Sequence, residues 1–203
     1  MSLKATLRKM LAPVYRKRED LLLCKELKEE SGQISSGHLE VVPVGPVHLK
    51  ALVQFMQEHH VDAARSLRML DDCLWNRYEG RVAFLNGQVI GHRWWVTHAM
   101  SHPQLAVYGL SLREDELYAF GLYIAPAYRA QGYAGEFLAI TQKQLIDLGY
   151  KRLYNAVGAS NVPARRLYES FGSKEVGLRV SRSFFSAVTF CGGRWQRYSR
   201  VWM

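Results

Sequence analysis

Arg129-Ala130-Gln131-Gly132-Tyr133-Ala134 is the stretch of this sequence that decides the fold. It lies between an apolar, strand-like run that is closed by Pro126 and a helix-like run over residues 135–148. A turn of this kind exposes backbone N–H groups that have no partner within the helix, and the helix dipole adds partial positive charge there. The turn therefore predicts a binding site for a phosphate or a pyrophosphate at the start of the helix.

Composition indicates a folded protein and excludes several classes. The chain has 203 residues, of which 48% are hydrophobic and 12% aromatic, so one domain with a sizeable core is expected. No apolar stretch is long enough to span a bilayer, and residues 1–20 lack the continuous apolar core of a secretory signal. The three cysteines lie far apart without a CxxC pair, which favours a reducing compartment, so we expect a cytoplasmic protein without a zinc ribbon.

The charge of the chain is strongly positive, with a formal net charge of +9 at pH 7. Five arginines and no carboxylates occupy residues 176–203. Such a stretch favours an acidic partner, which includes acyl carrier proteins, nucleic acid and anionic membranes, and a basic surface that only keeps the protein soluble is equally compatible. Charge alone does not choose among these partners.

The N-terminal residues predict an extension that is separate from the main domain. Residues 3–30 carry an apolar stripe opposite lysines and arginines and are expected to be helical, in two pieces broken at Pro13. Such a helix either packs on the domain or contacts a membrane surface or a partner. Residues 31–37 have the composition of a linker, so we expect a basic helical extension and linker over 1–37 and the main domain over 38–203.

The main domain predicts strands that alternate with helices. Strands are expected at 38–44, 81–85, 88–97, 106–112, 117–124 and 152–157, and helices at 46–58, 63–78, 135–148 and after a cap at Ser160 or Asn161. Asn86-Gly87 is typical of a tight hairpin turn, and residues 176–203 indicate a final hairpin around Gly192-Gly193. The strand–helix–strand run over 117–157 makes its two strands parallel, so the fold class is α/β (α+β) with a mixed sheet.

Two motifs resemble those of a known family. Residues 122–134, Leu-Tyr-Ile-Ala-Pro-Ala-Tyr-Arg-Ala-Gln-Gly-Tyr-Ala, resemble motif A of the GNAT superfamily of N-acetyltransferases, which has Gln/Arg-x-x-Gly-x-Gly/Ala after an apolar strand. Residues 161–172, Asn-Val-Pro-Ala-Arg-Arg-Leu-Tyr-Glu-Ser-Phe-Gly, are similar to the same family's Asn-x-x-Ala-x-x-Leu-Tyr pattern. The close resemblance covers about residues 116–172 and implies the GNAT fold, a central mixed β-sheet flanked by helices. One departure is Ser173 after Gly172, where the family usually has phenylalanine.

The resemblance implies that the chain uses acetyl-CoA. The backbone N–H groups of residues 131–135 would hold the coenzyme A pyrophosphate, and the strand at residues 122–124 would pair with the pantetheine arm. The small residue at position 132 lets the cofactor approach the backbone closely. The cofactor-binding residues that the resemblance implies are Leu122, Tyr123, Ile124, Arg129, Ala130, Gln131, Gly132, Tyr133, Ala134, Gly135, Asn161 and Tyr168.

The expected reaction is transfer of an acetyl group from acetyl-CoA to an amine acceptor by direct attack in a ternary complex, since no cysteine lies near the motifs. Tyr168 aligns with the tyrosine that protonates the leaving thiolate in the family. Glu116, at the start of the motif A strand, is the first candidate for the catalytic base, and His92 and His98 are weaker candidates. The adjacent pair His59-His60 is expected to point apart on its helix, so no metal is expected.

Two other interpretations stay open at this point. In one, the chain is a catalytically inactive module that keeps the fold to bind coenzyme A. In the other, it is an acyltransferase whose acceptor is a macromolecule, an acyl carrier protein or a substrate linked to nucleic acid. The acceptor and the acyl chain length depend on residues for which the family has no shared motif.

Overall fold

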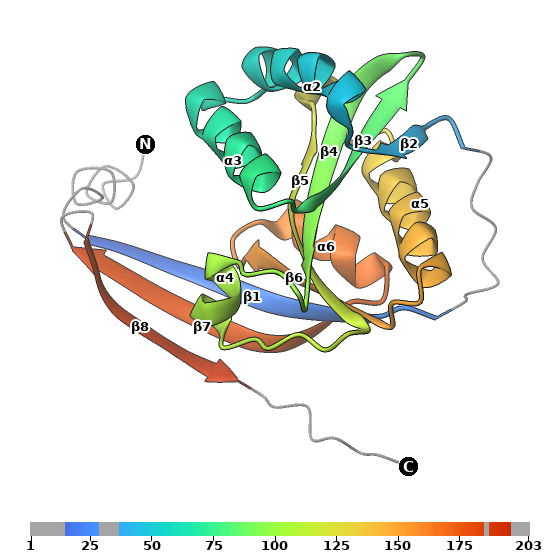
Figure 1. Ribbon diagram of the computed structural model, residues 1–203. Coiled ribbons are helices and arrows are strands. Elements are labelled where there is room, and N and C mark those ends of the chain that lie inside the picture. Colours follow the sequence, from blue (N-terminus) through green and yellow to red (C-terminus); the bar gives the residue numbers. More distant parts are fainter. Residues whose placement is uncertain (1–14, 29–36, 185–186, 196–203) are drawn as a thin grey trace. The chain divides into compact units, whose positions relative to one another are not determined.

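The computed structural model of the protein describes residues 15–28, 37–184 and 187–195 (Figure 1). The chain divides into two compact units, each of which is described by itself below. One unit is Glu26–Tyr154, and the other combines Met1–Lys25 with Asn155–Met203. The predicted fold class, α/β with a mixed β-sheet flanked by helices, is confirmed. Among the described residues, no helix has the length and apolar character needed to cross a membrane.

Antiparallel strands form the sheet of the unit Glu26–Tyr154. In spatial order they are β2 (Glu40–Pro43), β3 (Glu79–Leu85), β4 (Gln88–Thr97) and β5 (Glu116–Ile124). Strands β3 and β4 form the predicted hairpin. Its two turn residues, Asn86 and Gly87, have φ values of 51° and 78°, as a type I′ turn requires.

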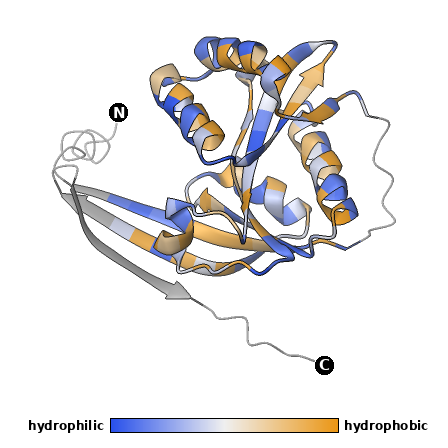
Figure 2. Cartoon of the chain, viewed as in Figure 1, coloured by the Kyte–Doolittle hydropathy of each residue, from blue (hydrophilic) through white to orange (hydrophobic). Residues whose placement is uncertain are grey.

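Helices cover both faces of this sheet (Figure 1). On one face, α2 (Pro46–His59) and α3 (Ala63–Trp75) share a buried cluster with Trp94 of β4. On the other face, α5 (Tyr133–Asp147) contributes Phe137 and Leu145 to clusters that include Ile124 and Trp95. The adjacent residues Trp94 and Trp95 thus serve opposite faces, as the alternation of a strand requires. Each of these helices carries both hydrophobic and hydrophilic residues (Figure 2), and its apolar side faces the sheet.

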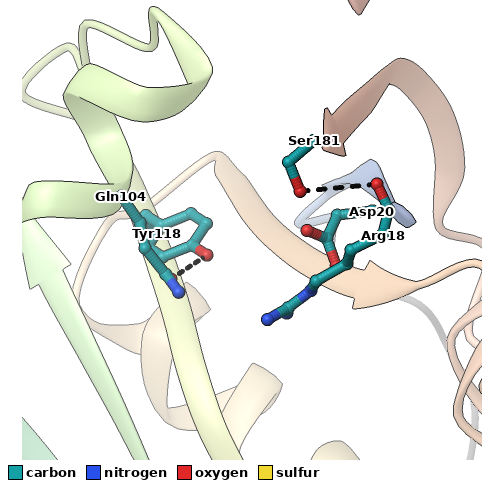
Figure 3. A network of polar contacts seen from close by, with 5 residues as sticks. All are labelled: Arg18, Asp20, Gln104, Tyr118 and Ser181. Carbon is teal, nitrogen blue, oxygen red and sulfur yellow. Dashed lines mark hydrogen bonds and ion pairs between the residues drawn. The ribbon is translucent and has the colours of Figure 1, made fainter. Parts of the chain in front are cut away.

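The segment before β5 corrects one expectation. Residues 106–112 were expected to form a strand, but residues 103–108 form the short helix α4 (Pro103–Tyr108). His102 caps this helix, its proline stands in the first turn, and Gly109 at a φ of 58° ends it. The apolar run was too short for its period to distinguish the two structures. The helix is held to β5 by Tyr118, whose hydroxyl donates to Gln104 Oε1 at 2.5 Å (Figure 3).

The second unit contains β1 (Tyr15–Glu26) as a strand, and this corrects the expected helix over residues 3–30. Strand β1 pairs antiparallel with β7 (Lys174–Phe184). Leu21, Leu22 and Leu23 are all buried, which suits a strand covered on both faces better than an amphipathic helix. The prediction of a helix is therefore wrong over Tyr15–Glu26, and with it the membrane or partner helix proposed there. Residues 1–14 and 29–36 lie outside the described part, and the domain limits 1–37 and 38–203 stay a prediction.

The remaining elements of this unit are the end of β6 (Arg152–Gly158), α6 (Val162–Ser170) and β8 (Ala187–Trp195). The final hairpin is confirmed, because β7 and β8 pair antiparallel. Its turn lies between Phe184 and Ala187, however, and Gly192-Gly193 stands inside β8. Strands β1 and β7 are also joined by Ser181 Oγ, which donates to Arg18 O at 3.5 Å, and the Arg18 guanidinium pairs with Asp20 (Figure 3).

Gly91 on β4 marks a close approach between β4 and β5. A Cβ at this position would lie 2.5 Å from Tyr123 O and 2.5 Å from Ile124 Cδ1. Because a backbone oxygen cannot move aside cheaply, we expect Gly91→Ala to lower the free energy of unfolding by about 2–3 kcal/mol. Gly158→Ala is the matched control, since a Cβ there meets no atom within 4 Å. Urea unfolding of both variants checks this, and equal midpoints would contradict it.

Candidate functional site

The segment that joins β5 to α5 is a compact turn with exposed backbone N–H groups. Ala130 and Gly132 have φ values of 58° and 86°, and Gly132 is the N-cap of α5 without a side-chain cap. Beyond Arg129, the first backbone N–H with an acceptor in the described part of the chain is that of Glu136, which donates to Gly132 O at 3.1 Å. The N–H groups of residues 131–135 can therefore donate hydrogen bonds to an anion, as in the concave amide nests that bind phosphate.

Gly132 has a conformational reason to be glycine. Its positive φ strains any residue that carries a Cβ. A Cβ built there would meet no atom of the described residues within 4 Å. The expected close approach of a phosphate to this backbone is therefore compatible with the local structure.

Arg129 is held beside this turn. Its Nε donates to Ile124 O at 2.8 Å, and its guanidinium carbon lies 5.2 Å from the centroid of the Tyr123 ring. Gln131 Nε2 donates to Ala127 O at 2.7 Å, which closes the turn on itself. The Arg129 charge is thus fixed at the start of the turn, against the end of β5, where it favours an anion.

Strand β5 contains a bulge just before the turn. His92 of β4 pairs with Tyr123, whereas Trp94, two residues further on, pairs with Phe120, three residues earlier. The extra residue lies at Gly121-Leu122, and Gly121 has a φ of 62°. A bulge shifts the faces of the strand. Phe120 and Tyr123 therefore pack against the same cluster under α2 and α3, although three residues separate them.

This bulge was not expected from the sequence. The available signal was a single glycine, Gly121, inside an otherwise apolar strand, which often marks a bulge. Leu122 and Ile124 face the cluster of α5 instead, and Ala134 and Tyr133 from the first turn of α5 join them there. The bulge interrupts the pairing with β4 at Leu122. Tyr123 and Ile124, which were also predicted to bind the pantetheine arm, stay paired with β4.

A group of aromatic side chains adjoins the turn on the face covered by α2 and α3. The Nε2 atoms of His60 and His92 are 3.2 Å apart, and the two rings are nearly coplanar, with 9° between their planes. His60 Nδ1 lies 2.7 Å from Ser66 Oγ. The His60 ring stacks on Tyr123 with 3.7 Å between centroids, and the Tyr123 hydroxyl donates to His59 O. We call His60, His92, Ser66 and Tyr123 the histidine cluster.

Both histidines of the cluster are neutral at pH 7. Burial, with a smaller effect from His60, lowers the pKa of His92 to about 3. Burial, then the charges of His59 and Arg129, lower the pKa of His60 below its usual value. His92 is 1% exposed, and its Nδ1 has no hydrogen-bond partner among the described residues. From the sequence, His60 was considered only with its neighbour His59, whereas the structure places His60 against His92.

The buried His92 makes stability depend on pH. Its folded pKa is about 3, below the ordinary 6.5, so the unfolded chain binds more protons between these values. We expect the free energy of unfolding to fall as the pH drops from 6.5 towards 3, by about 1.4 kcal/mol per pH unit from this residue. His92→Gln should flatten this dependence, and the exposed His38→Gln should leave it unchanged. Urea unfolding at several values between about pH 4 and 7.5 checks this. An unaltered slope in His92→Gln would contradict it.

Glu116 is a buried carboxylate with structural partners. Its Oε1 accepts a hydrogen bond from Arg152 at 2.7 Å, and its Oε2 accepts one from Arg113 N at 3.1 Å. It begins β5, whereas the turn before α5 follows the end of that strand. These contacts account for its burial, and its role as a base stays a prediction. His98, the other weak candidate, is exposed beyond the end of β4.

Asn161 and Tyr168 belong to the unit that contains α6. Asn161 is the N-cap of α6, and its Oδ1 accepts from Ala164 N at 3.3 Å, which confirms the predicted cap. Tyr168 is buried, and its carbonyl oxygen accepts from Ser173 N at 3.0 Å. Their roles at the cofactor stay predictions. Within the described ranges, no three His, Cys, Asp or Glu side chains are grouped as a metal ion would need.

The sequence profile of the acetyltransferase (GNAT) family matches residues 49–172. The chain belongs to this family. The match extends from α2 to the end of α6, so it includes the turn, the bulge and the histidine cluster. The resemblance noted from the two motifs is therefore confirmed.

Two individual GNAT relatives match shorter parts of the chain than the family profile does. The chain is 34% identical over 88 residues to the uncharacterized N-acetyltransferase YycN of Bacillus subtilis, covering 43% of this chain and 50% of that protein. It is 38% identical over 65 residues to a [ribosomal protein bS18]-alanine N-acetyltransferase of Haemophilus ducreyi. That match covers 32% of this chain and 45% of the relative. The chain thus spans about half the length of these curated relatives.

A solved structure shares the fold. The structure of AAC(6')-Iy, in complex with a bisubstrate analogue that contains CoA, matches with a TM-score of 0.52 and 17% identity. The match covers 68% of this chain and 92% of that one. At this identity the likeness concerns the fold alone.

Proposed function

We propose that this chain transfers an acetyl group from acetyl-CoA to an amine. The observation that carries the proposal is the turn before α5, where the amides of residues 131–135 have no acceptor among the described residues and Gly132 has a φ of 86°. Membership of the GNAT family supports it, since the family match includes this turn. A CoA-containing analogue bound to a protein of the same fold supports the same donor.

The turn fits a pyrophosphate group. The amides of residues 131–135 would donate to its oxygens, and the Arg129 guanidinium, already fixed by Ile124 O, would add charge. The backbone of β5 at Leu122–Ile124 would pair with the pantetheine arm. The bulge leaves Leu122 outside the regular register with β4. Ala130, Tyr133, Ala134 and Gly135 complete the surface that we propose to hold the cofactor. Bound acetyl-CoA would supply the acetyl group as a thioester.

The chemistry then requires three events. A neutral amine attacks the thioester carbonyl, the N–C bond forms while the C–S bond breaks, and the thiolate leaves with a proton. A backbone N–H of β5 would polarise the carbonyl oxygen. By its resemblance to the family tyrosine, Tyr168 would donate the proton to the thiolate, and Asn161 would contact the cofactor arm.

The acceptor that we propose is a primary amine. The relative from Haemophilus ducreyi acts on an alanine of a ribosomal protein, which makes a peptide with N-terminal alanine the first probe to test. An acidic partner for residues 176–203 stays a prediction, because most of their side chains lie outside the described part. We also propose a cytoplasmic location, supported by the three cysteines without a CxxC pair.

A transfer assay tests the proposal. The purified chain is incubated with acetyl-CoA and either an N-terminal alanine peptide or a small diamine, and released CoA thiol and acetylated amine are measured together. The proposal predicts equal amounts of both products. Binding of acetyl-CoA without any acetylated product would instead favour the inactive coenzyme A-binding module, and absence of binding would contradict both interpretations.

A further inference from the structure

We propose that His60 takes the proton from the acceptor amine and that His92 and Ser66 hold its imidazole for this task. The inference rests on the proposed function and adds the base that the function needs. A neutral amine that attacks a thioester must give up a proton as the N–C bond forms, and an imidazole is a common acceptor for it.

His60 lies beside the strand that we propose to bind the cofactor arm. It stands directly after α2, and its ring stacks on Tyr123 of β5 at 3.7 Å between centroids. Arg129, from the anion-binding turn, lies against the same Tyr123 ring. Only the Tyr123 ring therefore separates the imidazole from the backbone of β5, on the face that α2 and α3 cover.

Both nitrogens of His60 have partners that suit either charge state. In the neutral ring one nitrogen carries the proton, and the other accepts from Ser66 Oγ or from His92 Nε2. In the imidazolium both nitrogens donate, one to the Ser66 oxygen and one to the lone pair of His92 Nε2. The ring can thus gain a proton without losing a hydrogen bond and without turning away from Tyr123.

Burial determines which of the two histidines carries the positive charge. His92 is 1% exposed and stays neutral at ordinary pH, so it serves as an acceptor and the positive charge stays on His60. Around His60 stand His59 from α2, His92 from β4, Tyr123 from β5, Ser66 from α3 and the Arg129 charge from the turn. The charges and the burial keep the resting imidazole neutral, which is the form that accepts a proton.

The proton reaches His60 through Ser66, which is only partly buried at the start of α3. The amine N–H bond breaks as the N–C bond forms, and the proton passes to Ser66 Oγ. The hydroxyl proton of Ser66 moves at the same time to His60 Nδ1. The amine loses one proton, His60 gains one, and Ser66 is unchanged. The thiolate receives its proton separately, from Tyr168 in the proposed function.

His60→Gln tests this role in the transfer assay with the N-terminal alanine peptide and the diamine. We expect kcat to fall by about 100-fold or more, the usual contribution of a general base. The KM for acetyl-CoA should stay unchanged, and the acidic limb of the kcat/KM profile, expected below pH 6.5 since the pKa of His60 is lowered, should disappear. His38→Gln, a change at an exposed histidine, is the matched control and should behave as the wild type.

Ser66 supplies a second test that does not disturb the core. Ser66→Ala removes the hydroxyl and is expected to lower kcat by about 10-fold, whereas Ser66→Thr keeps it and should restore the rate. Proton NMR adds a readout that needs no acceptor. The His60 imidazole should titrate below pH 6.5, and the His92 imidazole should not titrate until about pH 3.

The outcomes separate the two proposals. Wild-type kcat and an unchanged acidic limb in His60→Gln would overturn the role of His60 and leave the acetyltransferase intact. If Ser66→Ala and Ser66→Thr have equal rates, the path through the hydroxyl is wrong. A wild-type chain that binds acetyl-CoA but acetylates neither probe would overturn the proposed function and this inference with it.

Discussion

Gly132→Glu is expected to abolish acetyl-CoA binding while the chain stays folded. Gly132 is the N-cap of α5 at a φ of 86°, and the proposed site for the pyrophosphate is the row of amides that begins beside it. A glutamate there both strains the turn and places a carboxylate against the amides that would bind the phosphates. We expect the affinity to fall by about 100-fold or more, which corresponds to about 2.7 kcal/mol.

The same helix provides a matched control for this change. Gly149 follows the other end of α5 with a φ of 87°, and a Cβ there also meets no atom within 4 Å. Gly149→Glu therefore imposes the same backbone strain, of order 1–3 kcal/mol, without touching the proposed site. Calorimetry with acetyl-CoA should show normal binding to Gly149→Glu and none to Gly132→Glu. Equal affinity in the two variants would remove the turn from the binding site.

Tyr168→Phe is expected to lower kcat by about 100-fold with little change in the affinity for acetyl-CoA. In the proposed function the hydroxyl acts only when the thiolate leaves, whereas the ring that fills the buried position is kept. Tyr150→Phe is the control, because Tyr150 lies at the end of α5 and packs against a separate cluster. The transfer assay and calorimetry measure the two quantities.

A Tyr168→Phe variant with the wild-type rate would show that another group protonates the thiolate. A variant that loses rate and affinity together would instead indicate a structural role for the hydroxyl. Only loss of kcat at constant affinity fits a proton donor that acts in the transition state.

The turn and its helix could be predicted from the sequence because their determinants are local. Pro126, the small residues at 130, 132 and 134, and the apolar run before them specify a strand, a turn and a helix within a few positions. The Asn86-Gly87 hairpin and the Asn161 cap are equally local, and both were found. The backbone conformations at Gly87, Gly132 and Asn161 follow from residue type.

The features that were missed depend on distant partners. Strand β1 pairs with β7, which lies more than one hundred residues later, as in the pair Leu21 and Leu178. An apolar stripe with basic neighbours looks helical when that partner is unknown. The predicted strand at residues 106–112 was wrong for a different reason, because a short apolar run fits a strand and a helix about equally well.

The histidine cluster illustrates the same limit at the site. His60 and His92 are separated by 32 positions in the chain, and their contact depends on α2 packing against β4. From the sequence, His60 was considered only together with its neighbour His59, as a possible pair of metal ligands. The β5 bulge at Gly121, which brings Tyr123 to the face of this cluster, had only one glycine as its signal.

An amide NMR titration of the full chain with coenzyme A asks whether the turn before α5 is the cofactor site. We predict that the backbone amides of residues 131–135 show the largest chemical shift changes, because their N–H groups would gain phosphate acceptors where the described part of the chain supplies none. Shifts that leave these amides unchanged, or that are largest near Glu116 at the far end of β5, would contradict the proposed site.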